Sequence, residues 1–173
     1  MAPAEPSRAA IRPAAAADAG PLATVFIDAW RQAYSGVVSG EVLAGLDHEQ
    51  VTRWLAGLIA SRAEGQTEVA VSGPDVAGFV RYGADLGQRG RGHVFGLYVH
   101  PARAGQGTGR ALLGHAEARL AAGGCADVSL YVFEANERAR RMYSAAGYRC
   151  DGERRVEAEY GAPEVRMVKV LAG

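Results

Sequence analysis

The sequence predicts one α/β domain built around a mixed β-sheet. Segments with strand-like alternation and segments with helical spacing of apolar residues follow one another in the order β-α-α-β-β-β-α-β-α-β-β. This order is not a repeating βαβ array, so the sheet should be mixed rather than purely parallel. The chain has 173 residues, which is enough for one domain with a complete core. We expect residues 8–173 to form that domain and residues 1–7 to be a disordered tail.

The first third of the chain is expected to be helical after one short strand. Residues 9–12 can form that strand, and the following proline closes it. Asp18 is a suitable N-cap for the first helix, and residues 35–36 end the helix with a glycine. The same helix carries one aromatic stripe at helical spacing, which consists of Phe26, Trp30 and Tyr34.

Capping and turn residues divide the rest of the chain into short elements. A second helical piece should begin at Ser39 or Gly40, and Asp47 should cap another. Residues 73–75 give a turn signal between two strands of a hairpin. The later elements are expected as strands over 68–72 and 76–82, a mobile loop over 83–92, a central strand over 93–100, a helix over 108–122, a strand over 127–133, a helix over 137–146 that Asn136 caps, and two final strands around a turn at 160–163.

Composition excludes several classes of protein. The formal net charge is zero, whereas a nucleic-acid binder needs a basic surface. Cys125 and Cys150 are too few for a disulfide framework or a metal cluster, and each is expected to be a small buried residue in a reducing compartment. No apolar run approaches ~20 residues and no signal-peptide pattern is present, so we expect a cytoplasmic protein with neither a membrane segment nor a metal.

The most informative stretch is the glycine-rich turn between the central strand and the helix that follows it. Gly105, Gly107 and Gly109 remove Cβ atoms where the backbone can expose its N–H groups. These groups gather at a helix N-terminus, whose dipole favours an anion. The turn lacks the GKS or GKT ending of a Walker P-loop and the GxGxxG of a dinucleotide fold. It predicts a pyrophosphate cradle, with a flexible glycine loop as the alternative.

Three motifs in this order resemble the GCN5-related N-acetyltransferase (GNAT) superfamily. The glycine turn resembles its motif A, (Gln/Arg)-x-x-Gly-x-(Gly/Ala), with Gly107 and Gly109 at the two glycine positions and Ala104 at the first. Residues 136–148 resemble motif B, Asn-x-x-Ala-x-x-x-Tyr-x-x-x-Gly-Tyr, and residues 97–101 resemble the fourth strand of the family. Residues 29–38 resemble a bacterial subgroup with a Trp-x-x-x-Tyr-x-Gly helix.

The resemblance implies the GNAT acyl-CoA N-acyltransferase fold, acetyl-CoA as the cofactor and CoA as the product. It implies that backbone groups of the central strand pair with the pantetheine arm beside a splayed sheet edge, and that the Val99 N–H faces the thioester oxygen. The positions implied to bind the cofactor are Leu97, Tyr98, Val99, Ala104, Gly105, Gln106, Gly107, Thr108, Gly109, Arg110, Asn136 and Tyr143. Arg110 and Asn136 have alternatives, as a surface arginine and as a helix cap.

Two residues are candidates for acid–base chemistry. Motif B implies that Tyr143 is the general acid for the departing thiolate, and a phenol pKa near ~10 keeps its proton at neutral pH. The alternative is a core aromatic residue. His93 stands four residues before Leu97, where relatives carry a glutamate or a histidine, so it is a candidate base; a structural strand-end histidine is the alternative. His48 and His115 fall on helix faces expected to be exposed.

The acceptor is expected to be a primary amine of a small molecule, such as a polyamine or an aminoglycoside-type antibiotic in a resistance enzyme. Trp30 and Tyr34 would form its wall, or would simply pack in the core. Asp28, Asp85 or Glu134 could attract a cationic acceptor. A protein N-terminal or lysine acetyltransferase and a non-catalytic acyl-CoA-binding sensor are the alternatives. A homodimer that pairs through the C-terminal strands is also expected.

Overall fold

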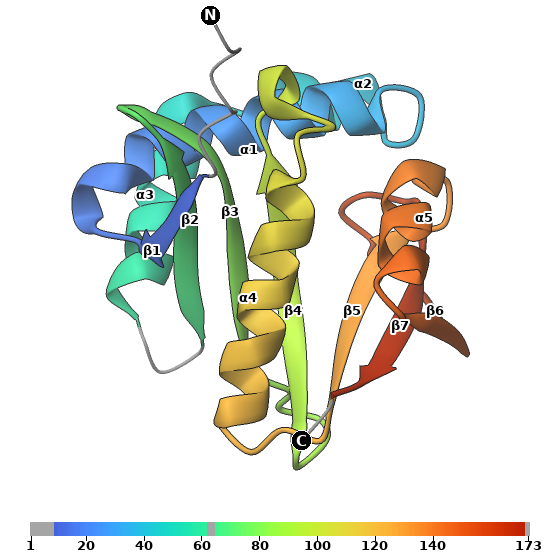
Figure 1. Cartoon of the computed structure of the whole chain (residues 1–173). Coiled ribbons are helices and arrows are strands. Elements are labelled where there is room, and N and C mark those ends of the chain that lie inside the picture. Colours follow the sequence, from blue (N-terminus) through green and yellow to red (C-terminus); the bar gives the residue numbers. More distant parts are fainter. Residues whose placement is uncertain (1–8, 62–64, 172–173) are drawn as a thin grey trace, which may run out of the picture.

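The computed structural model describes residues 9–61 and 65–171, and its centre is a seven-stranded sheet (Figure 1). The strands are β1 (Ala10–Pro13), β2 (Gln66–Ser72), β3 (Asp75–Ala84), β4 (Arg91–Val99), β5 (Asp127–Phe133), β6 (Arg149–Val156) and β7 (Pro163–Val170). Their order in the sheet is β1-β2-β3-β4-β5-β7-β6. Only β4 and β5 pair in parallel, and the other neighbours are antiparallel. The prediction of a mixed sheet is confirmed.

The helices also follow the expected order. They are α1 (Ala19–Tyr34), α2 (Gly40–Ala44), α3 (His48–Ala60), α4 (Thr108–Ala122) and α5 (Glu137–Ala145). The first third contains three helices, as the capping residues predicted, although the predicted element order counted only two because it did not separate the short α2 from α3. The loop between β3 and β4 is shorter than expected, since pairing continues to Ala84 on one side and from Gly92 on the other. The tail predicted for residues 1–7 lies outside the described residues.

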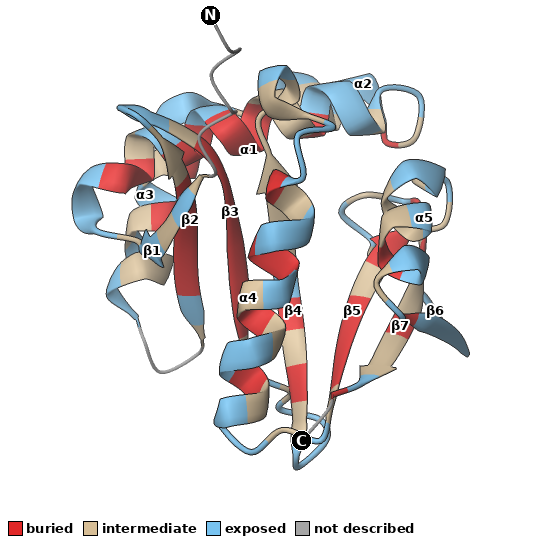
Figure 2. Ribbon diagram, in the orientation of Figure 1, coloured by how far each residue is buried: buried red, intermediate tan, exposed pale blue. Residues whose placement is uncertain are grey.

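Two hydrophobic cores lie on the two faces of the sheet (Figure 2). On one face α4 and α5 cover the strands, and Leu112, Leu113 and Leu130 are at most 1% exposed there. On the other face α1 and α3 cover β2 and β3, with Leu22 and Leu55 buried against them. Side chains alternate between faces along a strand, so each central strand contributes to both cores.

Most caps form as predicted, with one exception. Asp47 Oδ1 accepts the Gln50 N–H at 2.9 Å, and Asn136 Oδ1 accepts the Ala139 N–H at 3.1 Å. The Asp18 carboxylate does not cap α1: it accepts two hydrogen bonds from Arg12 and one from the Ala15 N–H. The Arg12 guanidinium beside it holds the pKa of this carboxyl below its usual range. Asp18 therefore stands at the predicted N-cap position, but its side chain forms no cap because a charged partner on β1 competes for the same oxygens.

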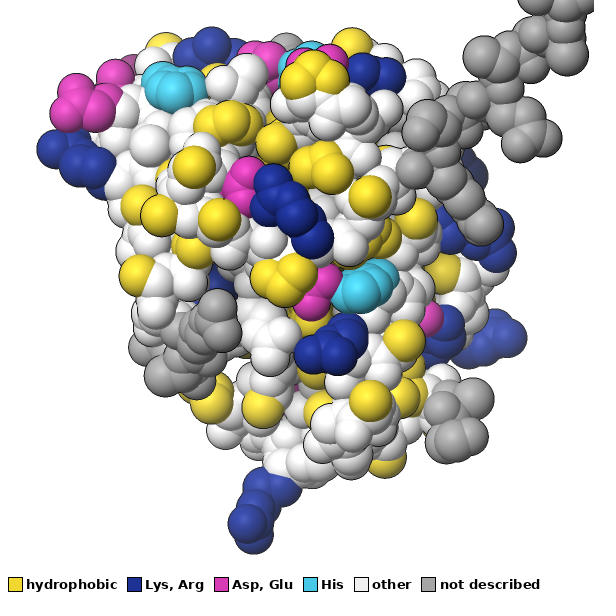
Figure 3. Space-filling model, turned by 60° about the vertical axis from the view of Figure 1, so that its left-hand side comes forward, with side chains coloured by type: hydrophobic (Ala, Val, Ile, Leu, Met, Phe, Trp, Pro, Cys, Tyr) yellow, Lys and Arg dark blue, Asp and Glu magenta, His cyan; other side chains and the backbone are white. Residues whose placement is uncertain are grey.

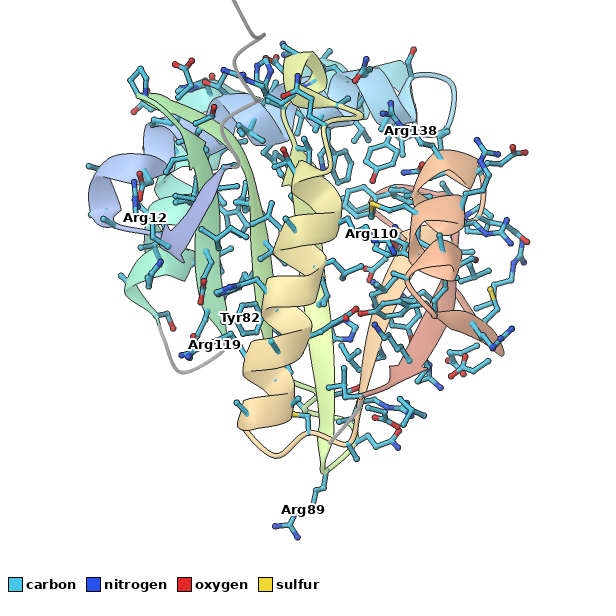
Figure 4. The ribbon with its side chains drawn as sticks, in the orientation of Figure 1. Arg12, Tyr82, Arg89, Arg110, Arg119 and Arg138 are labelled. Carbon is cyan, nitrogen blue, oxygen red and sulfur yellow. The ribbon has the colours of Figure 1, made fainter. Side chains whose placement is uncertain are left out.

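Two predictions of burial were also wrong. Cys150 is exposed, because β6 is an edge strand of the sheet and each of its residues has a large exposed fraction. His115 is half-buried: its imidazole pairs with Glu68, whose side chain is only 5% exposed. Tyr82 donates a hydrogen bond to the same carboxylate at 2.8 Å. Burial and this carboxylate raise the pKa of Tyr82 to about 12, and Arg119 reaches the phenol from α4 (Figure 4). This polar cluster fastens α4 to the sheet.

Surface charge and the length of the apolar helices are two further features of the described chain. Acidic and basic side chains are interspersed over the face that Figure 3 brings forward, without one sign dominating. Among the described helices, none is long and apolar enough to cross a membrane.

The feature that creates the site is the divergence of β4 from β5. These two strands pair only from Arg91–Asp127 to Val94–Leu130, at their lower ends in Figure 1. The register between β3 and β4 shifts at the same level, so Phe95 forms a β-bulge. Above the bulge β4 stays with β3 while β5 leans away with β7. The splayed edge that the resemblance implies is therefore present.

Candidate active site

Backbone groups of β4 are available at the splayed edge. The His100 N–H donates to Ala77 O on β3 at 2.9 Å. In an antiparallel pair alternate residues point their N–H groups to the same neighbour, so those of Leu97 and Val99 point to the opposite side. On that side the pairing with β5 has already ended at Val94. An extended ligand segment could therefore pair with Leu97 and Val99 as an added strand would.

The glycine turn exposes its backbone at the start of α4. Gly105 and Gly107 have φ values of 80° and 82°, a region that side chains disfavour. Gly107 is the N-cap of α4 and makes no side-chain cap, so the first N–H groups of the helix are left for a ligand. A Cβ on Gly109 would lie 3.4 Å from both Met142 Sδ and a methyl group of Val99. Gly105 and Gly107 thus have a conformational reason, and Gly109 leaves little room for a side chain larger than a methyl group.

A cleft of about 380 Å³ joins the glycine turn to the splayed edge, between α4, α5 and the end of α1. Most of the residues predicted to bind the cofactor line it: Leu97, Tyr98, Val99, Ala104, Gly105, Gly107, Thr108, Gly109, Arg110, Asn136 and Tyr143. Gln106 does not, and its side chain lies 3.5 Å from Ala102 O. Sequence reasoning missed further lining residues, which are Ala29, Gln32, Ala33, Arg103, Arg138, Ala139 and Met142.

Two arginines stand on facing sides of this cleft. Arg110 comes from the first turn of α4 and Arg138 from the first turn of α5, and both line the opening (Figure 4). Neither has a carboxylate partner among the described residues. By contrast, Arg141 on the outer side of α5 pairs with Glu137. Arg110 and Arg138 therefore form a cationic clamp, which fits the phosphate groups of a CoA molecule. Sequence reasoning could have found Arg138 from its position, because it stands two residues after Asn136, which caps the same helix.

Replacing Arg138 with alanine should weaken CoA binding about three- to ten-fold, since an exposed charge pair is worth roughly 1 kcal/mol. The loss should shrink as salt is raised, because exposed charges are screened. Isothermal titration calorimetry with CoA at two ionic strengths measures both effects. Arg141→Ala is the matched control, since this arginine is exposed on the same helix but outside the cleft. Equal affinities for the two variants would remove Arg138 from the phosphate site.

A second cavity, of about 310 Å³, opens on the other face of the sheet. Its walls come from α1, α3, α5, β4, β5 and the β6–β7 hairpin, and they are largely aromatic. The aromatic lining residues are Phe26, Trp30, Tyr34, Trp54, Phe95, Tyr98, Tyr131, Phe133, Tyr143 and Tyr160. Trp30 and Tyr34 pack edge to face with a centroid separation of 4.8 Å. Trp30 and Tyr34 therefore pack in the core and also line this cavity, and their contact with an acceptor stays a prediction.

The two cavities meet at the splayed edge. They share six lining residues, which are Tyr34, Leu97, Tyr98, Asn136, Ala139 and Tyr143. Asn136 caps α5 and also hydrogen-bonds the Tyr34 phenol, so one amide fixes part of the wall between them. Tyr143 is only 7% exposed, and burial together with the neighbouring Tyr98 raises its pKa. Its phenol therefore keeps its proton throughout the neutral range.

The second cavity carries charge as well as aromatic rings. Arg155 lies over the Tyr131 ring at 3.7 Å and pairs with Glu164 at 2.7 Å and Glu157 at 3.2 Å. Two carboxylates thus share one guanidinium, which leaves the lining with an excess negative charge.

The carboxylates expected near the acceptor lie elsewhere and have other partners. Asp28 faces His100, Glu134 pairs with Arg154, and Asp85 binds Ser129. The residues that do line the cavity, Glu157 and Glu164, come from the β6–β7 hairpin, whose placement depends on contacts distant in sequence.

His93 also lines the second cavity. Its ring lies 5.0 Å from the Phe95 ring, and its Nδ1 is 2.8 Å from Ser129 Oγ. Burial lowers the pKa of His93, and Arg155 and Arg166 act in the same direction, while Asp85 opposes them. The imidazole is therefore neutral at pH 7 and able to accept a proton. The part of the chain that the structure describes brings no three His, Cys, Asp or Glu side chains together as metal ligands.

Comparison with known proteins identifies the family. The model of the acetyltransferase (GNAT) family matches residues 26–148, well over half of the chain, and the chain belongs to this family. Mycothiol acetyltransferase of Propionibacterium freudenreichii is 39% identical over 93 residues, which cover 54% of this chain and 28% of that protein. The chain therefore matches less than a third of the length of this curated relative.

Solved structures share the same fold. The PaiA N-acetyltransferase of Thermoplasma acidophilum, in complex with coenzyme A, superposes with a TM-score of 0.79 at 21% identity, covering 93% of this chain and 98% of that one. The ribosomal-protein-alanine N-acetyltransferase of Brucella melitensis gives a TM-score of 0.72 at 22% identity, covering 94% and 99%. At these identities the likeness concerns the fold.

Proposed function

We propose that this protein is an acetyl-CoA-dependent N-acetyltransferase that acetylates a primary amine of a compact small molecule. The observation that carries the proposal is the meeting of two cavities at the splayed edge of β4. One has a glycine cradle and an arginine clamp suited to CoA. The other is aromatic and holds a neutral histidine. A thioester in the first cavity and an amine in the second would meet beside Leu97 and Tyr143.

Each reacting group has a residue of suitable chemistry nearby. The glycine turn and the clamp of Arg110 and Arg138 would hold the phosphates, and backbone groups of β4 would align the pantetheine arm. The Val99 N–H would donate to the thioester oxygen, where negative charge develops. His93 would accept the proton of the ammonium, and Tyr143 would donate to the departing sulfur.

The second cavity, which we call the acceptor cavity from here on, favours a small cationic amine with an apolar body. Its volume of about 310 Å³ is at the lower end of the usual range of ~300–1,000 Å³ for small-molecule sites. Aromatic rings suit an apolar or aromatic body, and the excess charge from Glu157 and Glu164 suits an ammonium group. The same two features disfavour a bulky polyhydroxylated aminoglycoside. Trp30 and Tyr34 also belong to the Trp-x-x-x-Tyr-x-Gly pattern, which we propose serves acceptor binding.

Steady-state acetyl-CoA turnover with a panel of acceptors tests the proposal. The panel contains an arylalkylamine, a polyamine, an aminoglycoside and a peptide with a free N-terminus. The compact monoamine is expected to give the largest kcat/KM. Preference for the peptide would favour a protein acetyltransferase, and tight CoA binding without turnover of any acceptor would favour an acyl-CoA-binding sensor. Association through the C-terminal strands stays a prediction, for which light scattering is the measurement.

The pH dependence tests the assignment of the base. His93 must be neutral to act, so the rate should fall as the pH drops through its pKa. Since burial lowers that pKa, the midpoint of the acidic limb of kcat/KM should lie below the ~6.5 of an exposed imidazole. His93→Ala should abolish this limb and lower kcat, while His48→Ala, an exposed histidine on α3, should leave both unchanged. An acidic limb that persists without His93 would assign the proton to water or to a carboxylate.

A further inference from the structure

The imidazole of His93 is hydrogen-bonded to Ser129, which is in turn hydrogen-bonded to Asp85. The proposed mechanism has given these two residues no role so far. His93 and Ser129 are register partners on β4 and β5, so their side chains lie on the same face of the sheet. His93 Nδ1 is 2.8 Å from Ser129 Oγ, and Ser129 Oγ is 3.2 Å from Asp85 Oδ2. Ser129 has no exposed surface, so its hydroxyl has to be satisfied inside the protein.

The Asp85 carboxylate is itself fixed in orientation. Asp85 follows the last residue of β3, and its backbone N–H donates to Arg91 O at 2.9 Å. Its Oδ1 accepts the Gly87 N–H at 2.8 Å, which leaves Oδ2 for Ser129. The turn between β3 and β4 thus aims one carboxylate oxygen at the buried hydroxyl.

Counting protons along this row settles which nitrogen of His93 carries its hydrogen. An ionised carboxylate can only accept hydrogen bonds, so Ser129 must use its single proton to donate to Asp85. The other acceptor within reach, Gly92 O, is more distant at 3.5 Å. Ser129 Oγ can then only accept from His93, and Nδ1 has to be the protonated nitrogen. Nε2 is left with a free lone pair on the side of the ring away from Ser129.

We propose that Asp85 and Ser129 are positioning residues for His93, which hold its imidazole as the Nδ1–H tautomer and present the bare Nε2 to the acceptor cavity. The catalytic part of this proposal rests on the function proposed above. When the acceptor is deprotonated, an N–H bond of the ammonium breaks and an Nε2–H bond forms. The positive charge on the ring then lies at the end of a row of hydrogen bonds that leads to the Asp85 carboxylate.

The charges around the ring predict how the row affects basicity. Asp85, from the β3–β4 turn, favours the protonated imidazole, whereas Arg155 of β6 and Arg166 of β7 oppose it. The rings of Phe95 and Tyr131 pack against the imidazole without adding charge. Removing the charge of Asp85 should therefore make His93 a weaker base and move the acidic limb of the pH–rate profile to lower pH.

The tautomer can be measured without any catalysis. The full chain is labelled with ¹⁵N-histidine, and the His93→Gln spectrum assigns the His93 signals among the four histidines. The wild-type protein should show a protonated Nδ1 and an unprotonated Nε2. In Asp85→Asn the new amide can donate to Ser129, which then donates to Nδ1, so the spectrum should change to the Nε2–H tautomer. Ser129→Ala should give a mixture. An Nε2–H tautomer in the wild type, or spectra unchanged in both variants, would overturn the proposal.

Kinetics then tests the consequence for catalysis. Asp85→Asn should lower kcat by ~10²-fold, within the range of a lost acid–base contribution, and should move the acidic limb downward. Asp127→Asn is the matched control: this neighbouring carboxylate on β5 pairs with Arg91 and touches neither His93 nor Ser129, so the tautomer and the limb should stay unchanged. A limb that stays in place in Asp85→Asn contradicts the positioning role. If no amine is acetylated at all, the proposed function fails, and the NMR spectra still decide the tautomer.

Discussion

A glutamate at position 107 should abolish CoA binding. Gly107 has a φ of 82° and forms the N-cap of α4, so any side chain there strains the backbone that presents the N–H groups. The carboxylate would also occupy the place of the phosphates with the same sign of charge. Calorimetry should therefore detect no CoA binding to Gly107→Glu at concentrations that saturate the wild type.

Gly109→Glu should lose CoA binding as well, for a different reason. A Cβ at this position already contacts Met142 and Val99 at 3.4 Å, so a longer side chain must enter the cleft. Gly114→Glu is the control for both substitutions, because it adds the same charge to an exposed position of α4 with open space around it. Unchanged CoA affinity in a folded Gly107→Glu protein would contradict the pyrophosphate assignment.

Tyr143→Phe should lower kcat at least ten-fold while the affinity for CoA stays nearly constant. The substitution keeps the ring that packs in the cleft and removes only the hydroxyl, and a positioned acid contributes ~10²–10⁴-fold to a rate. Burial raises the pKa of this phenol, so the phenol stays protonated but is a weaker acid toward the thiolate. Its effect should therefore lie toward the lower end of that range. Single-turnover kinetics with the best acceptor of the panel measures it.

Tyr148→Phe provides the matched control for this substitution. Tyr148 is 1% exposed, and its ring lies 5.8 Å from that of Tyr143. It lines neither the CoA cleft nor the acceptor cavity. Both variants lose one buried hydroxyl from the same core, and only Tyr143→Phe should slow the reaction. If Tyr143→Phe retains the full rate with an intact fold, the thiolate leaves without a proton from this residue.

The sequence predicted those parts of the site that depend on local structure. Gly105 and Gly107 adopt positive φ values and Asn136 caps α5, and both features are set by residues next to them in the chain. The order of strands and helices follows from apolar periodicity in the same way. Leu97 and Val99 were predicted from the resemblance of residues 97–101 to the fourth strand of the family, which is also a motif contiguous in the chain.

The missed parts depend on contacts between distant segments. Glu157 and Glu164 enter the acceptor cavity because the β6–β7 hairpin folds beside β5, which no local pattern indicates. Cys150 is exposed because β6 happens to be the outer strand, although its residue type favours burial. His115 looked solvent-facing on α4 until Glu68 of β2, 47 residues earlier, supplied a buried partner. Likewise, Asp18 occupies the N-cap position of α1, but its carboxylate binds Arg12 instead of a helix N–H.

The position of the two cavities on opposite faces of the sheet has a kinetic consequence. If the nucleotide thioester enters beside the glycine turn, which lines only the first of the two cavities, and the amine enters through the aromatic cavity, neither should obstruct the arrival or departure of the other. Double-reciprocal plots should then intersect, and excess amine should not compete with acetyl-CoA. A bisubstrate inhibitor, with an acceptor joined to the sulfur of CoA, would have to pass one of its halves through the opening beside Leu97. Such a compound should therefore bind to the protein slowly and, once bound, dissociate more slowly still.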